Sequence, residues 1–269
     1  VMTFMMVLDP HSRHSIGTGV IGGMIAFVIL RLLLRQIWLS GRARRILILA
    51  PKAVLTQWQV ELREKFNLDW PIYEGDSLVW QPTPAHRDGV AKPVSRQDWH
   101  KEPFVIASSH LMRRRERQTE LILDAEPWDL VVLDEAHHAR RKNPGAPGEG
   151  GPNLLLRLMQ GMVQQQRALG LLLLTATPMQ VHPVEVWDLV SLLGLPPEWS
   201  PQAFLEYFAV IGRGNPSHPD FDKLAALFRA TERRYGETPL ELAQTLVKDG
   251  SRLKARRLLG ALRDPAGTP

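Results

Sequence analysis

The stretch VVLDEAHHARR, residues 131–141, decides the fold, because a run of aliphatic residues in it ends on two acids and two histidines. A structural strand usually ends on Gly, Asn or Pro, since these residues turn the backbone at low cost. Two acids at the end of a buried strand instead indicate a site that holds a metal ion or acts on water.

Short aliphatic runs alternate with amphipathic stretches on both sides of this strand. Strands buried on both faces are predicted for RRILILAP, FVIASSH, DLVVLDEA and LGLLLLTATP, and a shorter strand for WPIYEG. Helices are predicted for TQWQVELREKF, RRRERQTELILDA and LLLRLMQGMVQQQRA. Strands that alternate with helices predict an α/β fold with a parallel sheet and helices on both faces.

The polar ends of three predicted strands, SSH, DEAHH and TATP, are expected at one edge of this sheet. Parallel strands have their carboxyl ends at the same edge, and the chemistry of such sheets gathers there. The agreement among these three ends is the strongest inference from the pattern.

The chain changes character after Pro183, where helical patterns follow one another without a strand. Four helices are predicted, for VEVWDLVSLLG, SPQAFLEYFAVIG, FDKLAALFRATERRYG and PLELAQTLVKDGSRLKARRLLGALR. We therefore expect an α/β domain over residues 1–195 and an all-helical extension over residues 196–269. Residues 76–103, which are rich in Pro, Asp, Arg and Gln, are expected to be an inserted loop.

The composition limits the classes of site and partner. The absence of cysteine excludes disulfides and thiolate zinc sites, and it fits a cytoplasmic protein. A formal net charge of +5 permits a polyanionic partner without requiring one. The chain begins with Val1 rather than Met, so we expect a fragment of a longer protein.

The uncharged run Ser15–Leu30 is predicted to be a buried helix rather than a membrane segment. Gly19 and Gly23 have the spacing of a membrane helix-pairing motif, but the run is shorter than the roughly 18–20 residues that span a bilayer. Arg31 and Arg35 interrupt the apolar sequence that follows.

Asp134 and Glu135 allow more than one interpretation. An Asp at the end of a buried strand can hold Mg²⁺ that bridges nucleotide phosphates, and an adjacent Glu can orient and deprotonate a water. Taken alone, such a pair is more often a solvated cap of the next turn. A metal site built on His137 and His138 lacks a third protein ligand at suitable spacing.

The run LLLLTATPMQ favours the nucleotide interpretation. A Thr-Ala-Thr after a continuous aliphatic strand, about 40 residues beyond DEAH, is hard to explain by packing. With it, the sequence resembles superfamily-two helicase-type ATPases: DEAHHAR looks like their second motif and LLTATPMQ like their third. The segments ILILAPKAVLTQWQVELREKF and FVIASSHLMRR resemble the Swi/Snf-like branch, and in particular its bacterial RNA-polymerase-associated and phage-defence members. The resemblance covers about Leu30 to Phe208.

This resemblance implies a RecA-like first motor domain that binds ATP and Mg²⁺ and acts on double-stranded DNA. Asp134 would serve Mg²⁺, Glu135 would serve the attacking water, and His137 would couple the nucleotide site to the rest of the motor. Thr175 and Thr177 would relay the nucleotide state to the nucleic-acid surface. The residues that fall where the family approaches the nucleic-acid backbone are Lys52, Gln57, Trp58, Ser108 and Ser109.

The phosphate-binding loop departs from the family pattern. Such a loop ends on Gly-Lys-Thr or Gly-Lys-Ser, and its lysine neutralises the phosphates. Here the expected place reads IGTGVIGGM, so Gly17, Gly19, Gly22 and Gly23 are the candidate nucleotide-binding residues. Gly23 and Met24, or in a second register Val20 and Ile21, stand where lysine and hydroxyl are expected. No lysine precedes Lys52.

Two functions from different classes are therefore expected. The first is the first motor domain of a DNA-dependent ATPase, impaired or truncated in this chain, with the second RecA-like domain absent and a protein partner conceivable. The alternative is a non-catalytic module that binds nucleic acid or protein and keeps the RecA-like fold. The arginine runs, including Arg113–Arg115, are interpreted as solvated helix faces.

Overall fold

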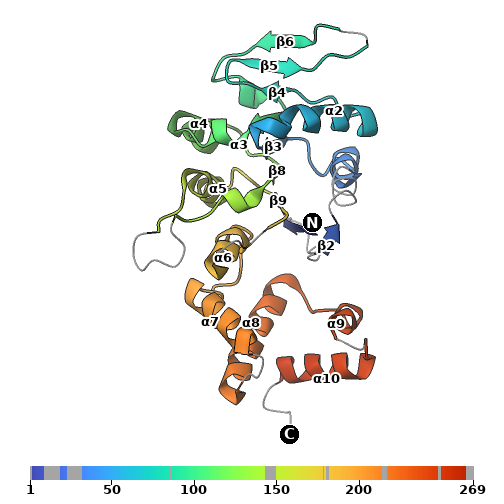
Figure 1. Ribbon diagram of the computed structural model, residues 1–269, viewed down its shortest axis with the longest axis vertical. Helices are drawn as coiled ribbons and strands as arrows, with labels where there is room; N and C mark the ends of the chain where they lie inside the picture. The colour runs from blue at the N-terminus through green and yellow to red at the C-terminus, as the bar shows by residue number, and fades with distance from the viewer. Residues whose placement is uncertain are drawn as a thin grey trace. The chain divides into compact units, whose positions relative to one another are not determined.

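The computed structural model describes residues 2–8, 19–22, 32–84, 87–142, 150–177, 179, 182–213, 217–247 and 250–264. The chain divides into two compact units, and the division in the described residues falls between Leu193 and Gly194 (Figure 1).

The larger unit is built on a mixed sheet with the strand order β2-β1-β9-β8-β3-β7-β4-β5-β6. The strands are β1 Met2–Leu8, β2 Gly19–Gly22, β3 Ile46–Ala50, β4 Ile72–Tyr73, β5 Ser77–Trp80, β6 Val90–Pro93, β7 Phe104–Ser108, β8 Leu130–Leu133 and β9 Leu171–Thr175. The central strands β9, β8, β3, β7 and β4 are parallel, and the two strands on each flank run antiparallel. The predicted parallel sheet is thus confirmed at its centre.

Helices cover both faces of the sheet, as predicted. The helices of this unit are α2 Leu55–Phe66, α3 Ser109–Met112, α4 Arg115–Thr119, α5 Leu154–Gln164 and α6 Pro183–Ser191, with residues 32–39 also helical. Shorter 3-10 turns are η1 Lys52–Val54, η2 Trp99–Lys101 and η4 Ala136–His138, and η3 Glu120–Asp124 is a π-helical turn.

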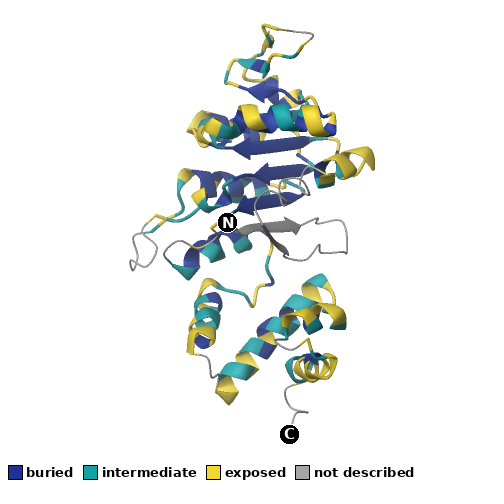
Figure 2. Ribbon diagram, turned by 45° about the vertical axis from the view of Figure 1, so that its right-hand side comes forward, coloured by how far each residue is buried: buried dark blue, intermediate teal, exposed yellow. Residues whose placement is uncertain are grey.

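Alternate side chains of each strand enter two different hydrophobic cores, because successive side chains of a strand point to opposite faces. Ile46 and Ile48 of β3 pack with Trp58 of α2, whereas Leu47 and Leu49 pack with the core that includes α5. Figure 2 shows the central strands fully buried between helices with exposed outer faces.

Strand β8 lies inside the sheet, between β3 and β9, as its aliphatic sequence predicts. Leu133 is in register with Leu49 of β3 and with Leu173 of β9. The strand is therefore hydrogen-bonded along both edges, and its carboxyl end is fixed within the row of parallel strand ends.

The expectation of an inserted loop over residues 76–103 was wrong in its main point. This stretch contains β5 and β6, which extend the sheet from β4, and its residues Leu78 and Trp99 are fully buried. The Pro-rich and charged composition concealed the short SLVW strand, whose pairing partner β4 is supplied from outside the stretch.

The side chain of Gln59 holds this hairpin to α2. Gln59 is fully buried, and its amide donates hydrogen bonds to the carbonyl oxygens of Trp70 and Val79 at 2.7 and 2.8 Å. Its Oε1 accepts a third hydrogen bond from the backbone N–H of Gln81 at 2.8 Å. A single glutamine thus satisfies three backbone groups beside the antiparallel strands.

The amino-terminal prediction was also wrong where the structure describes it. Gly19–Gly22, expected within a buried helix, form β2 and pair antiparallel with β1. Strand β1 was not predicted, and it pairs with β9, more than 160 residues away in the sequence. The rest of the run Ser15–Leu30 lies outside the described residues. None of the described helices is long and apolar enough to span a membrane.

The second unit consists of helices in its described residues. They are α7 Pro201–Arg213, α8 His218–Tyr235, α9 Leu240–Leu246 and α10 Arg252–Arg263. The last predicted helix is in fact two, and the backbone of Gly250 between them has a φ of +61°, which a helix cannot accommodate. Arg263 of α10 donates hydrogen bonds to both carboxylate oxygens of Glu232 on α8, at 2.7 and 2.8 Å.

Replacing Gln59 with Leu should destabilise the larger unit by roughly 2–4 kcal/mol, because three backbone groups lose their partner without regaining water. The loss would appear as a lower urea midpoint. The matched control is Gln57→Leu, since Gln57 lies on the same helix and is exposed. Equal effects of the two substitutions would contradict the role assigned to Gln59.

Candidate functional site

The carboxyl ends of β3, β7, β8 and β9 lie together at one edge of the sheet. Ala50 is in register with Ser108, and Leu133 with both Leu49 and Leu173. The polar residues that follow these strands are therefore neighbours, as the expected parallel order requires.

Asp134 is held by two donors from different parts of the chain. It is buried, and its own backbone N–H donates to the carbonyl oxygen of Leu49 at 2.8 Å. Its Oδ2 accepts a hydrogen bond from the indole N–H of Trp58 on α2 at 2.8 Å, and its Oδ1 accepts one from the backbone N–H of Glu135 at 2.9 Å. The orientation of this carboxylate is thus set on both oxygens.

Glu135 has a left-handed backbone, with φ of +51° and ψ of +48°. This conformation is uncommon for a residue other than glycine, and it turns the chain abruptly from β8 into η4. As a result the Glu135 side chain is 42% exposed while that of Asp134 stays buried. Two adjacent carboxylates therefore occupy different environments.

His137 connects the end of β8 to the end of β9. Its Nδ1 lies 3.1 Å from Thr175 Oγ1 and 3.1 Å from Glu135 Oε2. Burial, assisted by the charge of Arg140, lowers the pKa of His137 below its ordinary value, so the ring is neutral at pH 7. Thr175 Oγ1 in turn accepts a hydrogen bond from the backbone N–H of Thr177 at 3.2 Å.

Two arginines fasten the segment after η4 to α6. Arg141 binds Asp188 through its backbone N–H and through its guanidinium, with a shortest distance of 2.7 Å from Nη2 to Oδ1. Arg140 lies 3.1 Å from Glu185 Oε1. Both acids are buried, so the charge at the end of VVLDEAHHARR is in large part neutralised by α6.

The oxygen donors of this edge fit a hard divalent cation such as Mg²⁺. Mg²⁺ in proteins is usually bound by one or two carboxylates together with phosphates and water, so the single buried carboxylate of Asp134 is an adequate protein ligand. The described part of the chain contains no group of three or more His, Cys, Asp and Glu that could form a closed metal cage. This fits a metal that arrives with a phosphate ligand better than a structural metal site.

Residues 22–230 match the protein family described as the SNF2-related domain. The chain belongs to this family. The matched range begins in β2 and ends within α8, so it includes every part of the edge described above.

Among relatives of this SNF2-related chain are RNA polymerase-associated proteins called RapA. The protein from Vibrio campbellii is 29% identical over 197 residues, which is 73% of this chain and 18% of that protein. The protein from Cronobacter sakazakii is 28% identical over 250 residues, which is 88% of this chain and 23% of that protein. The chain thus spans about a fifth of the length of these relatives.

A solved structure with partial similarity is the Sulfolobus solfataricus SWI2/SNF2 ATPase core in complex with dsDNA. It shares 17% sequence identity with a TM-score of 0.43, and the alignment covers 73% of this chain and 34% of that one.

The residues predicted from the DEAH and TAT motifs of this SNF2-related domain lie together. Asp134, Glu135 and His137 follow β8, and Thr175 and Thr177 follow the neighbouring strand β9. The printed contacts join four of them in one path from Glu135 through His137 and Thr175 to Thr177. Their individual roles stay predictions.

Three of the five candidate nucleic-acid contacts are buried. Trp58 is 1% exposed, Ser109 is 4% exposed and Ser108 is 6% exposed, so these side chains do not fit a direct contact with a nucleic acid. Lys52 and Gln57 are exposed, as the prediction requires. The helical spacing of Trp58 with other apolar residues already favoured the core over the surface.

The candidate glycines are only partly described. Gly19 and Gly22 belong to β2, whereas Gly17 and Gly23 lie outside the described residues. Their role in nucleotide binding stays a prediction.

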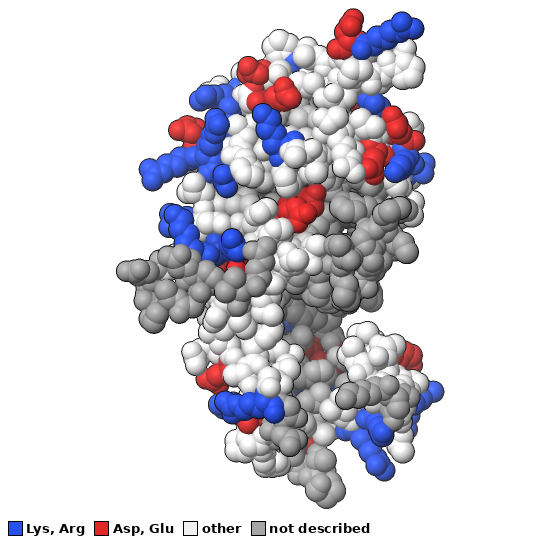
Figure 3. All heavy atoms as spheres, viewed as in Figure 1, with Lys and Arg blue, Asp and Glu red and all other residues white. Residues whose placement is uncertain are grey.

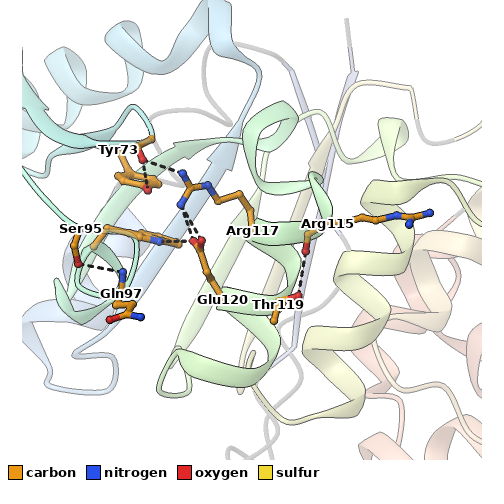
Figure 4. A network of polar contacts seen from close by, with 9 residues as sticks. Tyr73, Ser95, Gln97, Arg115, Arg117, Thr119 and Glu120 are labelled. Carbon is orange, nitrogen blue, oxygen red and sulfur yellow. Dashed lines mark hydrogen bonds and ion pairs between the residues drawn. The ribbon is translucent and has the colours of Figure 1, made fainter.

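A second polar cluster, missed by the sequence analysis, lies between the β4–β5 turn and η3 (Figure 4). Arg117 binds both oxygens of Glu120 at 2.8 and 3.0 Å, and the indole of Trp99 donates to the same carboxylate at 3.0 Å. Arg117 and the hydroxyl of Tyr73 both donate to the carbonyl oxygen of Gly75. Burial raises the pKa of Tyr73, which keeps its hydroxyl a donor.

The neighbouring arginines differ from Arg117. Arg113, Arg114 and Arg115 are exposed, as expected of a solvated helix face, and Figure 3 shows basic side chains gathered over α3 and α4. The i, i+3 spacing of Arg117 and Glu120 was the available signal for the pair. The arginines that bind α6 gave no local signal, because their partners lie more than 40 residues away.

Replacing Asp188 with Ala should destabilise the larger unit by about 2 kcal/mol. The value lies below the ~3–5 kcal/mol of a fully buried pair, because the Arg141 side chain is 31% exposed and regains water. Urea unfolding would measure the loss. Lys101→Ala is the control, since it removes a surface pair with Asp98 and should leave the midpoint unchanged. An unchanged midpoint for Asp188→Ala would show that the contact with α6 is dispensable.

Proposed function

We propose that this chain supplies the first motor domain of a DNA-dependent ATPase of the Swi/Snf type, with hydrolysis impaired by its glycine-rich segment. The observation that carries the proposal is the pair of adjacent carboxylates, one buried and oriented and the other half-exposed, at the carboxyl end of a central parallel strand. Membership of the SNF2-related family supports the same conclusion.

Asp134 is proposed to hold Mg²⁺ that accompanies the phosphates of ATP. When bound, the metal neutralises charge that develops on the phosphoryl oxygens. The chain's own contribution is orientation: the carboxylate is fixed on both oxygens before any ligand binds, so little reorganisation is required.

Glu135 is proposed to orient the attacking water and to take its proton. The left-handed turn carries its carboxylate away from the buried position of Asp134, so the two acids do not compete for one role. His137, neutral at pH 7, links Glu135 to Thr175, and through it to Thr177. This path supports a role in coupling the nucleotide site to the surface beyond β9.

The proposed partner is double-stranded DNA. The exposed side chains of Lys52 and Gln57 lie just before and on α2, the helix whose Trp58 binds Asp134. The partial structural match was solved with dsDNA, and the relatives are named as associated with RNA polymerase, so a protein partner and a cytoplasmic location belong to the same proposal. A second RecA-like domain is part of it as well.

The competing function is a binding module without hydrolysis. It is favoured by one observation, the absence of any lysine before Lys52, because the lysine of a phosphate-binding loop supplies much of the electrostatic stabilisation. The two functions share the fold and differ in turnover.

Installing the missing groups should reveal the nucleotide site. Gly23→Lys with Met24→Thr completes the loop pattern that begins at Gly17, and it should raise the affinity for Mg²⁺–ATP at least about tenfold, since a charge-assisted contact to phosphate is gained. A fluorescent ATP analogue would measure the affinity. The unmodified chain should release phosphate far below the ~1–100 s⁻¹ of a working phosphoryl-transfer enzyme.

The matched control places the same two residues in the second register, as Val20→Lys with Ile21→Thr. These positions lie within β2, and the pair should not raise the affinity. Adding Asp134→Ala to the first variant should abolish the gain. No gain in either register would contradict an ATP site at these glycines, and fast turnover by the unmodified chain would contradict the impairment.

Binding to DNA should be independent of sequence and should weaken steeply with salt, because it depends on phosphate contacts and counterion release. Lys52→Ala should lower the affinity equally for unrelated duplexes in a fluorescence-anisotropy titration. Lys65→Ala, which removes an exposed lysine at the far end of α2, is the control. Tight, salt-insensitive binding to one sequence would refute this partner.

A further inference from the structure

We propose that Trp58 is a positioning residue that fixes the carboxylate of Asp134 for a metal–nucleotide ligand. The inference rests on the proposed function and replaces the expectation that Trp58 touches nucleic acid. Its indole N–H lies 2.8 Å from Asp134 Oδ2, and the two residues are 76 positions apart in the sequence.

The contact is specific and is not a general consequence of burying a tryptophan. Trp58, Trp99 and Trp128 are all fully buried, yet the indole nitrogen of Trp128 has no hydrogen-bond partner. Packing alone therefore does not provide an indole with a carboxylate in this protein. The indole of Trp58 is aimed at the one buried acid that stands at the carboxyl end of β8.

The two hydrogen bonds of Asp134 act on different oxygens. The backbone N–H of Glu135 binds Oδ1 and the indole of Trp58 binds Oδ2, so rotation of the carboxylate about its Cβ–Cγ bond is restricted from both sides. Without the indole, Oδ2 would lose a donor that is anchored in a packed helix. The remaining contact comes from the flexible turn that carries Glu135.

An indole is well suited to this task because it donates one hydrogen bond and carries no charge. An arginine or lysine in its place would orient the carboxylate equally well but would repel a divalent cation. The neutral donor holds the ligand while leaving its negative charge for the metal. Groups that orient a metal ligand in this way typically change metal affinity by about 10–100-fold when they are removed.

Trp58→Phe tests the inference, because it keeps most of the aromatic volume and removes the N–H. The affinity for Mn²⁺ in the presence of ADP, measured by electron paramagnetic resonance, should fall about tenfold. Trp128→Phe is the matched control: it removes an equally buried indole whose nitrogen has no partner, and it should leave the affinity unchanged. Equal losses in both variants would reduce Trp58 to a packing role.

The spectrum of the indole supplies a readout that a packing role would not move. The Trp58 N–H resonance, assigned by its absence in Trp58→Phe, should shift when Mn²⁺ is replaced by diamagnetic Mg²⁺ and ADP is added. It should move to higher field in Asp134→Ala and no longer respond to the ligand. An unshifted Trp58 resonance in Asp134→Ala would overturn the hydrogen bond and with it the inference.

Asp134→Ala also separates failure of the inference from failure of the proposed function. If this variant binds Mn²⁺ and ADP as the unmodified chain does, the metal site at Asp134 is refuted, and the role of Trp58 falls with it. If Asp134→Ala loses binding and Trp58→Phe keeps it, the proposed function survives and the positioning role alone is overturned.

Discussion

The burial of β8 between two parallel neighbours is the constraint on which the rest of the structure depends. Its backbone is paired on both edges, and the pairing continues one residue further, where the N–H of Asp134 donates to Leu49. The end of the strand therefore cannot slide along the sheet. This fixes Asp134 beside the end of β3 and places Thr175 of β9 within reach of His137.

Beyond that end, the backbone and three surrounding elements give each polar side chain its own environment. The left-handed turn at Glu135 separates two adjacent carboxylates, α2 supplies a neutral donor to Asp134, and α6 supplies acids to the arginines that follow. The same helix α2 carries the exposed Gln57 next to the buried Trp58. A movement of α2 would thus be felt at the Asp134 carboxylate.

The central sheet and the grouping of the motifs could be predicted because they rest on local signals. Continuous aliphatic runs indicate doubly buried strands, and parallel strands bring their carboxyl ends together whatever the intervening sequence. Strands β1, β5 and β6 could not be predicted in the same way, since their apolar pattern is weak and their partners come from elsewhere in the chain. Composition assigned residues 76–103 to a loop, whereas pairing with β4 and the bonds of Gln59 made a hairpin.

The sequence by itself determined that the acids of DEAH follow a buried strand and that a Thr-Ala-Thr follows its neighbour, because hydrophobic burial reads directly from aliphatic runs. Only the tertiary structure decided what each polar side chain binds. Trp58 has the spacing of a core residue and the motif of a surface one, and its partner Asp134 is 76 residues away. Hydrogen bonds and ion pairs act over about 3 Å, so their partners are chosen by the packing of whole elements and leave no trace in local sequence.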